Sequence, residues 1–278
     1  MSGSQQVSRD ALSYPESDRS FLEPYLSPAH RSSSRSNELP FVTLTFATSL
    51  DSSLSLSPDV QTALSGPQSK AMTHYLRSRH DAILIGVGTA IADNPSLNCR
   101  LEGVGGYGGE GLDGQPRPVV IDPHLRWDFD GRTKVFDLAA RKMGKAPYIV
   151  TSSDSLLFAR EVKLLKELGG RFIQIPPGPS GQLSWTTILE ALRGLDISSV
   201  MIEGGAHVIN ALLGPNDAPI VDSVIVTIAP TWLGKDGALV CPEARHDENG
   251  RRLPVARLKD VRWHPLGEDV VLSGRMKP

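Results

Sequence analysis

Short apolar runs recur along the chain and predict the strands of a buried sheet. The first of them, residues 41–47, is rich in β-branched and aromatic side chains. Later runs such as residues 82–85 are apolar without alternation, which is typical of parallel strands that are covered on both faces. The predicted strands are residues 41–47, 82–85, 119–121, 148–150, 172–173, 200–202 and 224–228.

Helical periodicity occupies several of the intervals between these strands. Residues 69–80 are compatible with a helix, and residues 206–213 form another, which ends at Gly214. Ser184 is placed to cap a third helix. A fourth is indicated by leucines that share one face, namely Leu157, Leu164, Leu165 and Leu168. The alternation of strand and helix predicts an α/β fold with a mainly parallel sheet and helices on both of its faces.

The two ends of the chain depart from this alternation. Residues 1–36 are rich in Ser, Pro and charge and have no period, so they are predicted to be a flexible tail. Residues 37–278 are then one domain. Near the far end, residues 261–263 and 270–272 predict an antiparallel hairpin. The glycine-rich run at residues 103–115 is predicted to be a mobile surface loop.

Composition narrows the class of protein. The chain has 278 residues, of which 40% are hydrophobic, and 29 basic and 31 acidic side chains leave a formal charge of −2. This balance argues against a nucleic-acid or membrane surface built on bulk charge. Cys99 and Cys241 are far apart, and the seven histidines include no HxxxH or HxE pair, so no metal site is expected. No apolar run reaches about 20 residues and no signal pattern is present, so a cytoplasmic location is expected.

Two glycine-containing turns follow predicted strands and could receive phosphate groups. The first is Gly86-Val87-Gly88-Thr89, where glycines let the backbone approach an anion at a helix N-terminus. It lacks the GxGxxG spacing, so a plain strand-to-helix turn explains it about as well. The second turn is Glu203-Gly204-Gly205. A carboxylate at a strand tip can hold a ligand hydroxyl or amine while the following N–H groups bind a diphosphate. The alternative is a tight turn with a solvated Glu203.

A third segment suits a phosphate monoester. Ser69 lies in the first turn of a predicted helix that also carries Arg77, and a hydroxyl, a helix N-terminus and a guanidinium together favour such an anion. A lone arginine more often lies on a solvated helix face. His74 and His207 are more often surface or packing residues than ligand contacts.

The order and spacing of these segments resemble the reductases of riboflavin biosynthesis, including the reductase half of the bacterial deaminase-reductase. The resemblance runs from about Pro40 to the final strand, and it implies a dihydrofolate-reductase-like fold. The motifs that carry it are Thr48-Ser49-Leu50-Asp51, Ser65-Gly66, Leu76-Arg77, Asp81-Ala82-Ile83, Gly88-Thr89, Asp93-Asn94-Pro95-Ser96-Leu97, Arg100, Pro118-Val119-Val120-Ile121-Asp122, Glu203-Gly204-Gly205 and Ala229-Pro230.

The resemblance also implies which residues meet each ligand. The cofactor would be NADPH, with NADH left open, and a homodimer is implied. Residues expected beside the cofactor are Thr48, Thr89, Asp93, Pro123, Ile175, Gly204, Gly205, Ala206, His207 and Val208. Residues expected beside a phosphorylated ribosylaminopyrimidine are Ser69, Arg77, Leu97, Arg100 and Glu203, with the serine and the arginines around the 5′-phosphate. Candidates for the 2′-phosphate of NADPH, read from their place after a strand, are Thr151, Ser152 and Ser153.

The implied reaction reduces C1′ of the ribosylamino group to a ribitylamino side chain, and Glu203 is the candidate catalytic residue. A fused deaminase is excluded, because the chain has no HxE with PCxxC for its zinc. Two alternatives stay open. One is another reductase of the same fold that acts on a pterin or folate, and the other is a non-catalytic nucleotide-binding protein whose serine-rich tail recruits partners.

Overall fold

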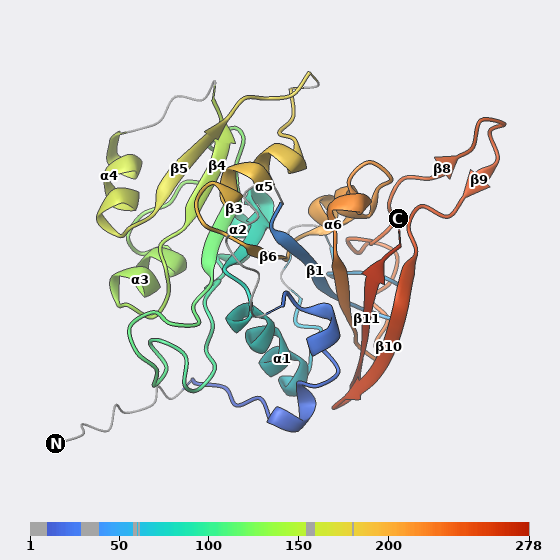
Figure 1. The fold of residues 1–278 in the computed structure, drawn as a ribbon, viewed down its shortest axis with the longest axis horizontal. Coiled ribbons are helices and arrows are strands. Elements are labelled where there is room, and N and C mark those ends of the chain that lie inside the picture. The colour runs from blue at the N-terminus through green and yellow to red at the C-terminus, as the bar shows by residue number, and fades with distance from the viewer. Residues whose placement is uncertain are drawn as a thin grey trace.

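The computed structural model describes residues 10–28, 39–57, 60, 62–153, 159–179 and 181–277. Its centre is a nine-stranded sheet with the order β10-β11-β7-β1-β6-β2-β3-β4-β5 (Figure 1). Its strands are β1 (Phe41–Thr48), β2 (Ala82–Gly86), β3 (Arg117–Ile121), β4 (Tyr148–Ser152), β5 (Arg171–Ile175), β6 (Ser199–Ile202), β7 (Ser223–Ile228), β10 (Leu258–Leu266) and β11 (Asp269–Met276). A separate small pair, β8 (Arg245–His246) and β9 (Arg252–Leu253), is antiparallel.

Strands β1 to β7 pair parallel with one another, whereas β11 pairs antiparallel with both β7 and β10. The predicted mainly parallel sheet with a C-terminal antiparallel hairpin is therefore confirmed. All seven predicted strands are present, each close to its expected place. The apolar runs located them because strands buried on both faces need no polar alternation.

Helices cover both faces of the sheet, as predicted. They are α1 (Pro67–Ser78), α2 (Val87–Asp93), α3 (Lys134–Ala140), α4 (Ala159–Glu167), α5 (Trp185–Arg193) and α6 (Ala206–Leu213). Helices α5 and α6 pack on one face, where their apolar side chains join Leu44 and Val200 in a single core cluster. On the other face α1 packs with Met201, while α2, α3 and α4 pack with Ile83. Alternate residues of the central strands thus enter opposite cores.

Two details of the helix predictions have different outcomes. Ser184 occupies the N-cap position of α5, but its side chain makes no capping hydrogen bond. The predicted leucine face is carried by α4, in which Leu165 is buried, while Leu157 lies outside the described residues. No helix in the described ranges is long and apolar enough to cross a membrane.

The predicted flexible tail is wrong for residues 10–28. This segment carries Leu22, which is fully buried, and it packs against α1 and the β10–β11 hairpin (Figure 1). The Phe21 ring stacks on His264 at a centroid distance of 4.0 Å, and the Tyr25 hydroxyl donates to the carbonyl of Asp260. The apolar side chains have no period because they follow a turn-rich path over a surface that other elements provide. The rest of the predicted tail, residues 1–9 and 29–36, lies outside the described residues.

The predicted mobile loop at residues 103–115 is instead tightly packed. Tyr107 and Gln115 are buried, and the Gln115 amide donates to the carbonyls of Cys99 and Gly105 at 2.7 and 2.8 Å. A Cβ added at Gly109 would lie 2.3 Å from the carbonyl oxygen of Gly103. The glycines therefore permit close approach of backbone to backbone rather than motion.

Candidate active site

The predicted ligand-binding residues cluster at one edge of the sheet because the strands that carry them are parallel neighbours. The carboxyl ends of β1, β6, β2, β3, β4 and β5 all lie along this edge. Thr48 ends β1, Glu203 follows β6, and Pro123 lies just beyond β3. In open α/β sheets this is the edge where ligands bind.

The two glycine turns meet just beyond the carboxyl ends of the neighbouring strands β2 and β6. The backbone N–H of Gly205 donates to the hydroxyl of Thr89 at 3.2 Å. Gly205 is exposed at the N-cap of α6, and no side chain caps this helix. Gly204 has a φ of 155°, which a residue with a side chain rarely adopts, and a Cβ at Gly88 would meet no atom within 4 Å. Because the first N–H groups of a helix have no partner within it, those of Ala206 and His207 at the start of α6 are available to an anion.

The remaining residues assigned to the cofactor differ in exposure. On α6, His207 is exposed, Ala206 is half-buried and Val208 is buried. At the end of α2, burial raises the pKa of Asp93 above its usual value. Thr48, the last residue of β1, is buried, and its hydroxyl donates to the carbonyl of Ser49 at 3.2 Å.

At the far strands, the Pro123 carbonyl accepts hydrogen bonds from the Ser152 N–H and the Thr151 hydroxyl, both at 3.2 Å. Ile175 is buried in the core, and its carbonyl accepts from the Ser153 N–H. Thr151 and Ser152 are buried whereas Ser153 is exposed. Of the three candidates for a 2′-phosphate contact, Ser153 alone presents an open side chain.

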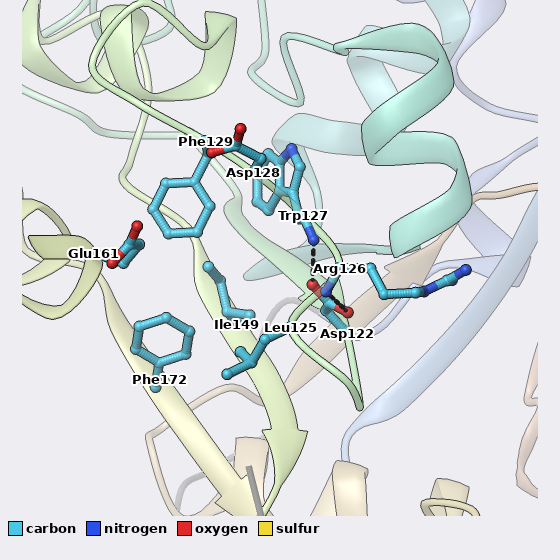
Figure 2. A pocket seen from close by; sticks show the side chains of 9 residues that line it. All are labelled: Asp122, Leu125, Arg126, Trp127, Asp128, Phe129, Ile149, Glu161 and Phe172. Atoms are coloured by element: carbon cyan, nitrogen blue, oxygen red, sulfur yellow. Dashed lines mark hydrogen bonds between the residues drawn. The ribbon is translucent and has the colours of Figure 1, made fainter. Parts of the chain in front are cut away.

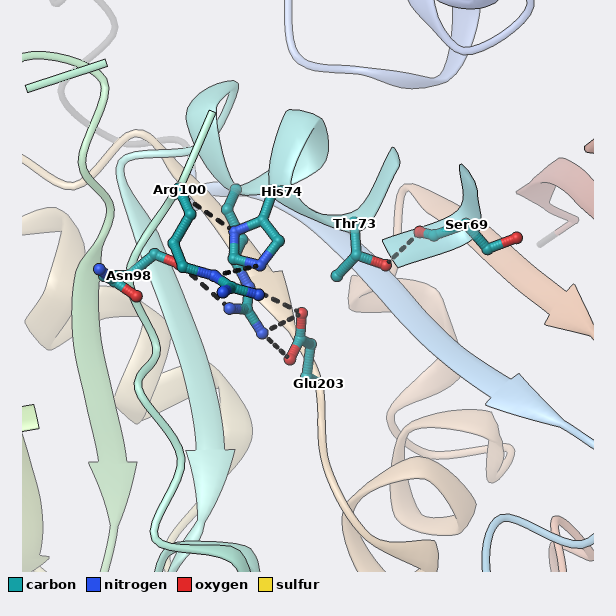
Figure 3. A network of polar contacts seen from close by, with 7 residues as sticks. Ser69, Thr73, His74, Asn98, Arg100 and Glu203 are labelled. Atoms are coloured by element: carbon teal, nitrogen blue, oxygen red, sulfur yellow. Dashed lines mark hydrogen bonds and ion pairs between the residues drawn. The ribbon is translucent and has the colours of Figure 1, made fainter. Parts of the chain in front are cut away.

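Glu203 is paired with Arg77 of α1, 126 positions away in sequence. Their closest contact is 3.0 Å between Nη2 and Oε2, and the side chains are only 12% and 19% exposed (Figure 3). Arg77 Nη1 also donates to the carbonyl of Asn98 at 3.1 Å. The Asn98 amide is fixed in turn by the Tyr107 hydroxyl and the Met143 carbonyl. The carboxylate is therefore held at the sheet edge by a guanidinium that is itself anchored.

Arg100 lies against the same cluster through His74 (Figure 3). The backbone N–H of Arg100 donates to His74 Nδ1 at 3.0 Å. The guanidinium of Arg100 lies 3.7 Å from the carboxylate of Asp10. Burial, reinforced by the charges of Arg77 and Arg100, lowers the pKa of His74 to about 2. The ring is therefore neutral at any physiological pH.

The other two predicted substrate residues have separate positions. Leu97 is buried, with a φ of 52°, in the loop that leads to Arg100. Ser69 is buried in the first turn of α1, and its hydroxyl has no hydrogen-bond partner. Eight residues of helix separate Ser69 from Arg77, or about 12 Å along the axis. Figure 3 shows Arg100 near Glu203 and Ser69 apart from them. Arg77 joins this cluster through its ion pair with Glu203.

A cavity of about 160 Å³ lies elsewhere, beneath the loop that follows β3 (Figure 2). Trp127, Phe129 and Phe172 line it, and none of the predicted site residues does. Asp122 reaches its wall, but both carboxylate oxygens accept hydrogen bonds from the N–H groups of Arg126 and Trp127 at 2.9 Å. Asp122 therefore shapes the loop. Among the described residues, no group of three or more His, Cys, Asp or Glu side chains could hold a metal ion.

Sequence reasoning missed Asn98 and Asp10 as neighbours of the site, and it considered His74 more often a surface or packing residue than a ligand contact. His74 did leave a signal, since it precedes Arg77 by three positions on a helix and residues at that spacing share a face. Asn98 contacts Arg77 through its backbone carbonyl, and Asp10 contacts Arg100 from a position 90 residues earlier in the chain. Neither kind of contact leaves a pattern in the sequence.

Comparison with known proteins gives consistent matches over nearly the whole chain. Residues 40–272 match the family described as the RibD C-terminal domain. The chain is 39% identical to a 2,5-diamino-6-ribosylamino-4(3H)-pyrimidinone 5′-phosphate reductase of Candida glabrata, over 92% of this chain and 96% of that protein. It is also 39% identical to the protein of that name from Saccharomyces cerevisiae, over 92% of this chain and 94% of that one.

Solved structures agree with these matches. The riboflavin biosynthesis reductase of Saccharomyces cerevisiae superposes with a TM-score of 0.72 at 34% identity, covering 94% of this chain and 100% of that one. RibD of Acinetobacter baumannii superposes with a TM-score of 0.66 at 22% identity, covering 86% of this chain and 59% of that one, and so shares the fold.

Proposed function

The chain belongs to the RibD C-terminal domain family, and on this premise we propose that it reduces 2,5-diamino-6-ribosylamino-4(3H)-pyrimidinone 5′-phosphate in riboflavin biosynthesis, with NADPH as reductant. The observation that carries the proposal is the buried Glu203–Arg77 pair. It lies where an open glycine turn, suited to a dinucleotide, adjoins two arginines suited to a sugar phosphate.

The residues at the sheet edge fit a dinucleotide. The N-terminus of α6 has no side-chain cap, Gly205 is exposed, and the space above Gly88 is open. Gly204, Gly205 and Val208 would hold the diphosphate, and Thr89 and Asp93 would lie beside the nicotinamide. We assign the contact with the 2′-phosphate to Ser153, because it is exposed whereas Thr151 and Ser152 are buried. Since only NADPH carries this phosphate, we propose NADPH as the preferred cofactor over NADH.

The bound cofactor would supply a hydride from C4 of its nicotinamide. The substrate accepts it at C1′ after its ribose ring opens to an imine, and a proton from water completes the amine nitrogen. The chain's contribution is to hold the two carbons together and exclude water, which in favourable cases lowers a barrier by about 7–11 kcal/mol. Glu203 would orient the ribosylamino group and stabilise the positive charge that develops there. Arg77 holds this carboxylate in place.

The arginines and Ser69 are the proposed substrate contacts. Arg100 would bind the 5′-phosphate, and Leu97 would wall the site beside it. The unpartnered, buried hydroxyl of Ser69 is available for a hydrogen bond to the same ligand. Arg77 would lie beside the same phosphate while its guanidinium holds Glu203.

The test is NADPH oxidation by the purified protein with the diaminopyrimidine phosphate present and absent. We expect turnover only when it is present, and none with dihydrofolate. Turnover of dihydrofolate alone would favour a folate reductase, and tight NADPH binding without any turnover would favour a non-catalytic nucleotide-binding protein.

A homodimer is part of the proposal, and β10 supports it. This edge strand carries Val261 and Trp263, which are exposed two positions apart and so lie on one side of the strand. A cytoplasmic location stays a prediction from the sequence.

A further inference from the structure

His74 stands between the two arginines of the candidate substrate site. Its ring is buried on α1, one turn before Arg77, and it contacts Arg100 from the other side (Figure 3). The Arg100 backbone N–H lies 3.0 Å from Nδ1, and Arg100 Nε lies 3.5 Å from Nε2. No step of the proposed reaction uses this ring.

The shorter contact fixes which ring nitrogen carries the proton. A backbone N–H can only donate, so Nδ1 must accept and the single proton of the neutral ring is on Nε2. Arg100 Nε, also a donor, then makes no true hydrogen bond at 3.5 Å.

This arrangement holds Arg100 without adding charge. Arg77, the other arginine, is held by the carbonyl of Asn98. A carboxylate in place of the ring would neutralise one guanidinium, as Glu203 does for Arg77. Burial keeps the ring uncharged, so Arg100 retains its full charge toward an anion, apart from the partly exposed Asp10 at 3.7 Å.

We infer that His74 is a positioning residue for phosphate recognition: its Nδ1 holds the Arg100 main chain so that the guanidinium meets the anionic end of the substrate. The inference rests on the proposed function, because that function assigns the 5′-phosphate to Arg100. It predicts that changes at His74 act on phosphate binding and leave the hydride-transfer step unaffected.

Three substitutions at His74 distinguish the effect of losing the Nδ1 acceptor from the effect of losing the volume of the ring. Asparagine can place its Oδ1 where Nδ1 stands, glutamine reaches the position of Nε2 instead, and leucine fills space without an acceptor. For His74→Asn we expect a KM for the phosphorylated pyrimidinone within about threefold of wild type. For His74→Gln and His74→Leu we expect KM to rise about tenfold, the typical effect of stranding a buried donor, with kcat within about twofold.

The phosphate supplies a second readout. For the same pyrimidinone without its 5′-phosphate, none of the three variants is expected to change KM by more than about twofold. His80→Leu is the matched control, because His80 is a buried histidine of the same region whose ring contacts Leu76 and Thr43 instead of the site. It is expected to lower stability and leave the preference for the phosphorylated substrate intact.

Equal losses on both substrates, or a His74→Asn variant as impaired as His74→Leu, would overturn the inference. If His74→Leu does not fold, the asparagine and glutamine variants still give opposite expectations. Binding of ribose 5-phosphate, measured by calorimetry, separates this inference from the proposed function. Weaker binding to His74→Gln than to His74→Asn, in a protein that turns over no pyrimidinone, would leave the positioning role standing and the proposed function wrong.

Discussion

Glu203 is the residue whose replacement should affect chemistry most. Glu203→Gln removes the negative charge that faces the substrate and leaves Arg77 without its ion pair. We expect kcat/KM to fall at least tenfold, since losing one charged transition-state contact removes about 1.4 kcal/mol or more. Steady-state NADPH oxidation measures it.

The control for this variant is Glu190→Gln, an exposed carboxylate on α5. It should leave kcat/KM within about twofold of wild type. A Glu203→Gln enzyme that also stays within twofold would remove Glu203 from the catalytic role proposed here.

His80 should make stability depend on pH. Burial lowers the pKa of His80 to about 4, from 6.5 in an unfolded chain. The unfolded state therefore binds the extra proton between these values, so the free energy of unfolding falls as pH drops from about 6.5 to about 4, by up to about 3 kcal/mol. Urea denaturation at several pH values should show this slope reduced in His80→Gln. Parallel curves for the variant and wild type would contradict it.

At this scale the sequence selected candidate site residues but not their partners. Arg77 could be selected because a guanidinium suits a phosphate, Glu203 because a carboxylate at a strand tip can hold a hydroxyl or amine, and Arg100 because its motif resembles a known family. Their pairing could not, because Arg77 and Glu203 lie 126 positions apart and meet only once β6 and α1 are packed. His74 was interpreted as a surface or packing residue, and the sequence could not decide between the two, because its burial depends on residues far from it in the chain.

At the scale of elements, the strands were predictable and the segment at residues 10–28 was not. A strand that is buried on both faces has an unbroken apolar run in its sequence, whatever its neighbours are. Residues 10–28 contain apolar side chains without a period, so their burial depends on the apolar side chains that α1 and the C-terminal hairpin supply. Those side chains come together only in the tertiary fold.

Leu22 tests whether this segment stabilises the fold. It is fully buried, and Leu22→Ala should lower the free energy of unfolding by about 2–5 kcal/mol, the range for buried leucines. Urea denaturation measures this. Leu56→Ala, at a residue that is 52% exposed, should change it by less than about 0.5 kcal/mol. Equal effects of the two substitutions would mean that the segment is held only loosely.

At the scale of the whole molecule, the edge of the sheet bears on assembly. Trp263 is 61% exposed on the edge strand β10, and an open apolar edge favours pairing with a second copy. Trp263→Lys should shift the protein from dimer toward monomer in sedimentation equilibrium. Trp232→Lys, at a tryptophan that is 72% exposed outside the sheet, should leave the mass unchanged. A wild-type monomer would exclude the proposed dimer.

The packing of residues 10–28 against β10 and β11 also has a consequence for synthesis on the ribosome. This segment is synthesised before residues 258–276, which form the hairpin that packs against it. Until that hairpin emerges, Phe21 lacks its partner His264, and a chain that stalls before the hairpin would present this apolar surface to chaperones and proteases. Packing of residues 10–28 is thus completed only after residues 258–276 have been made.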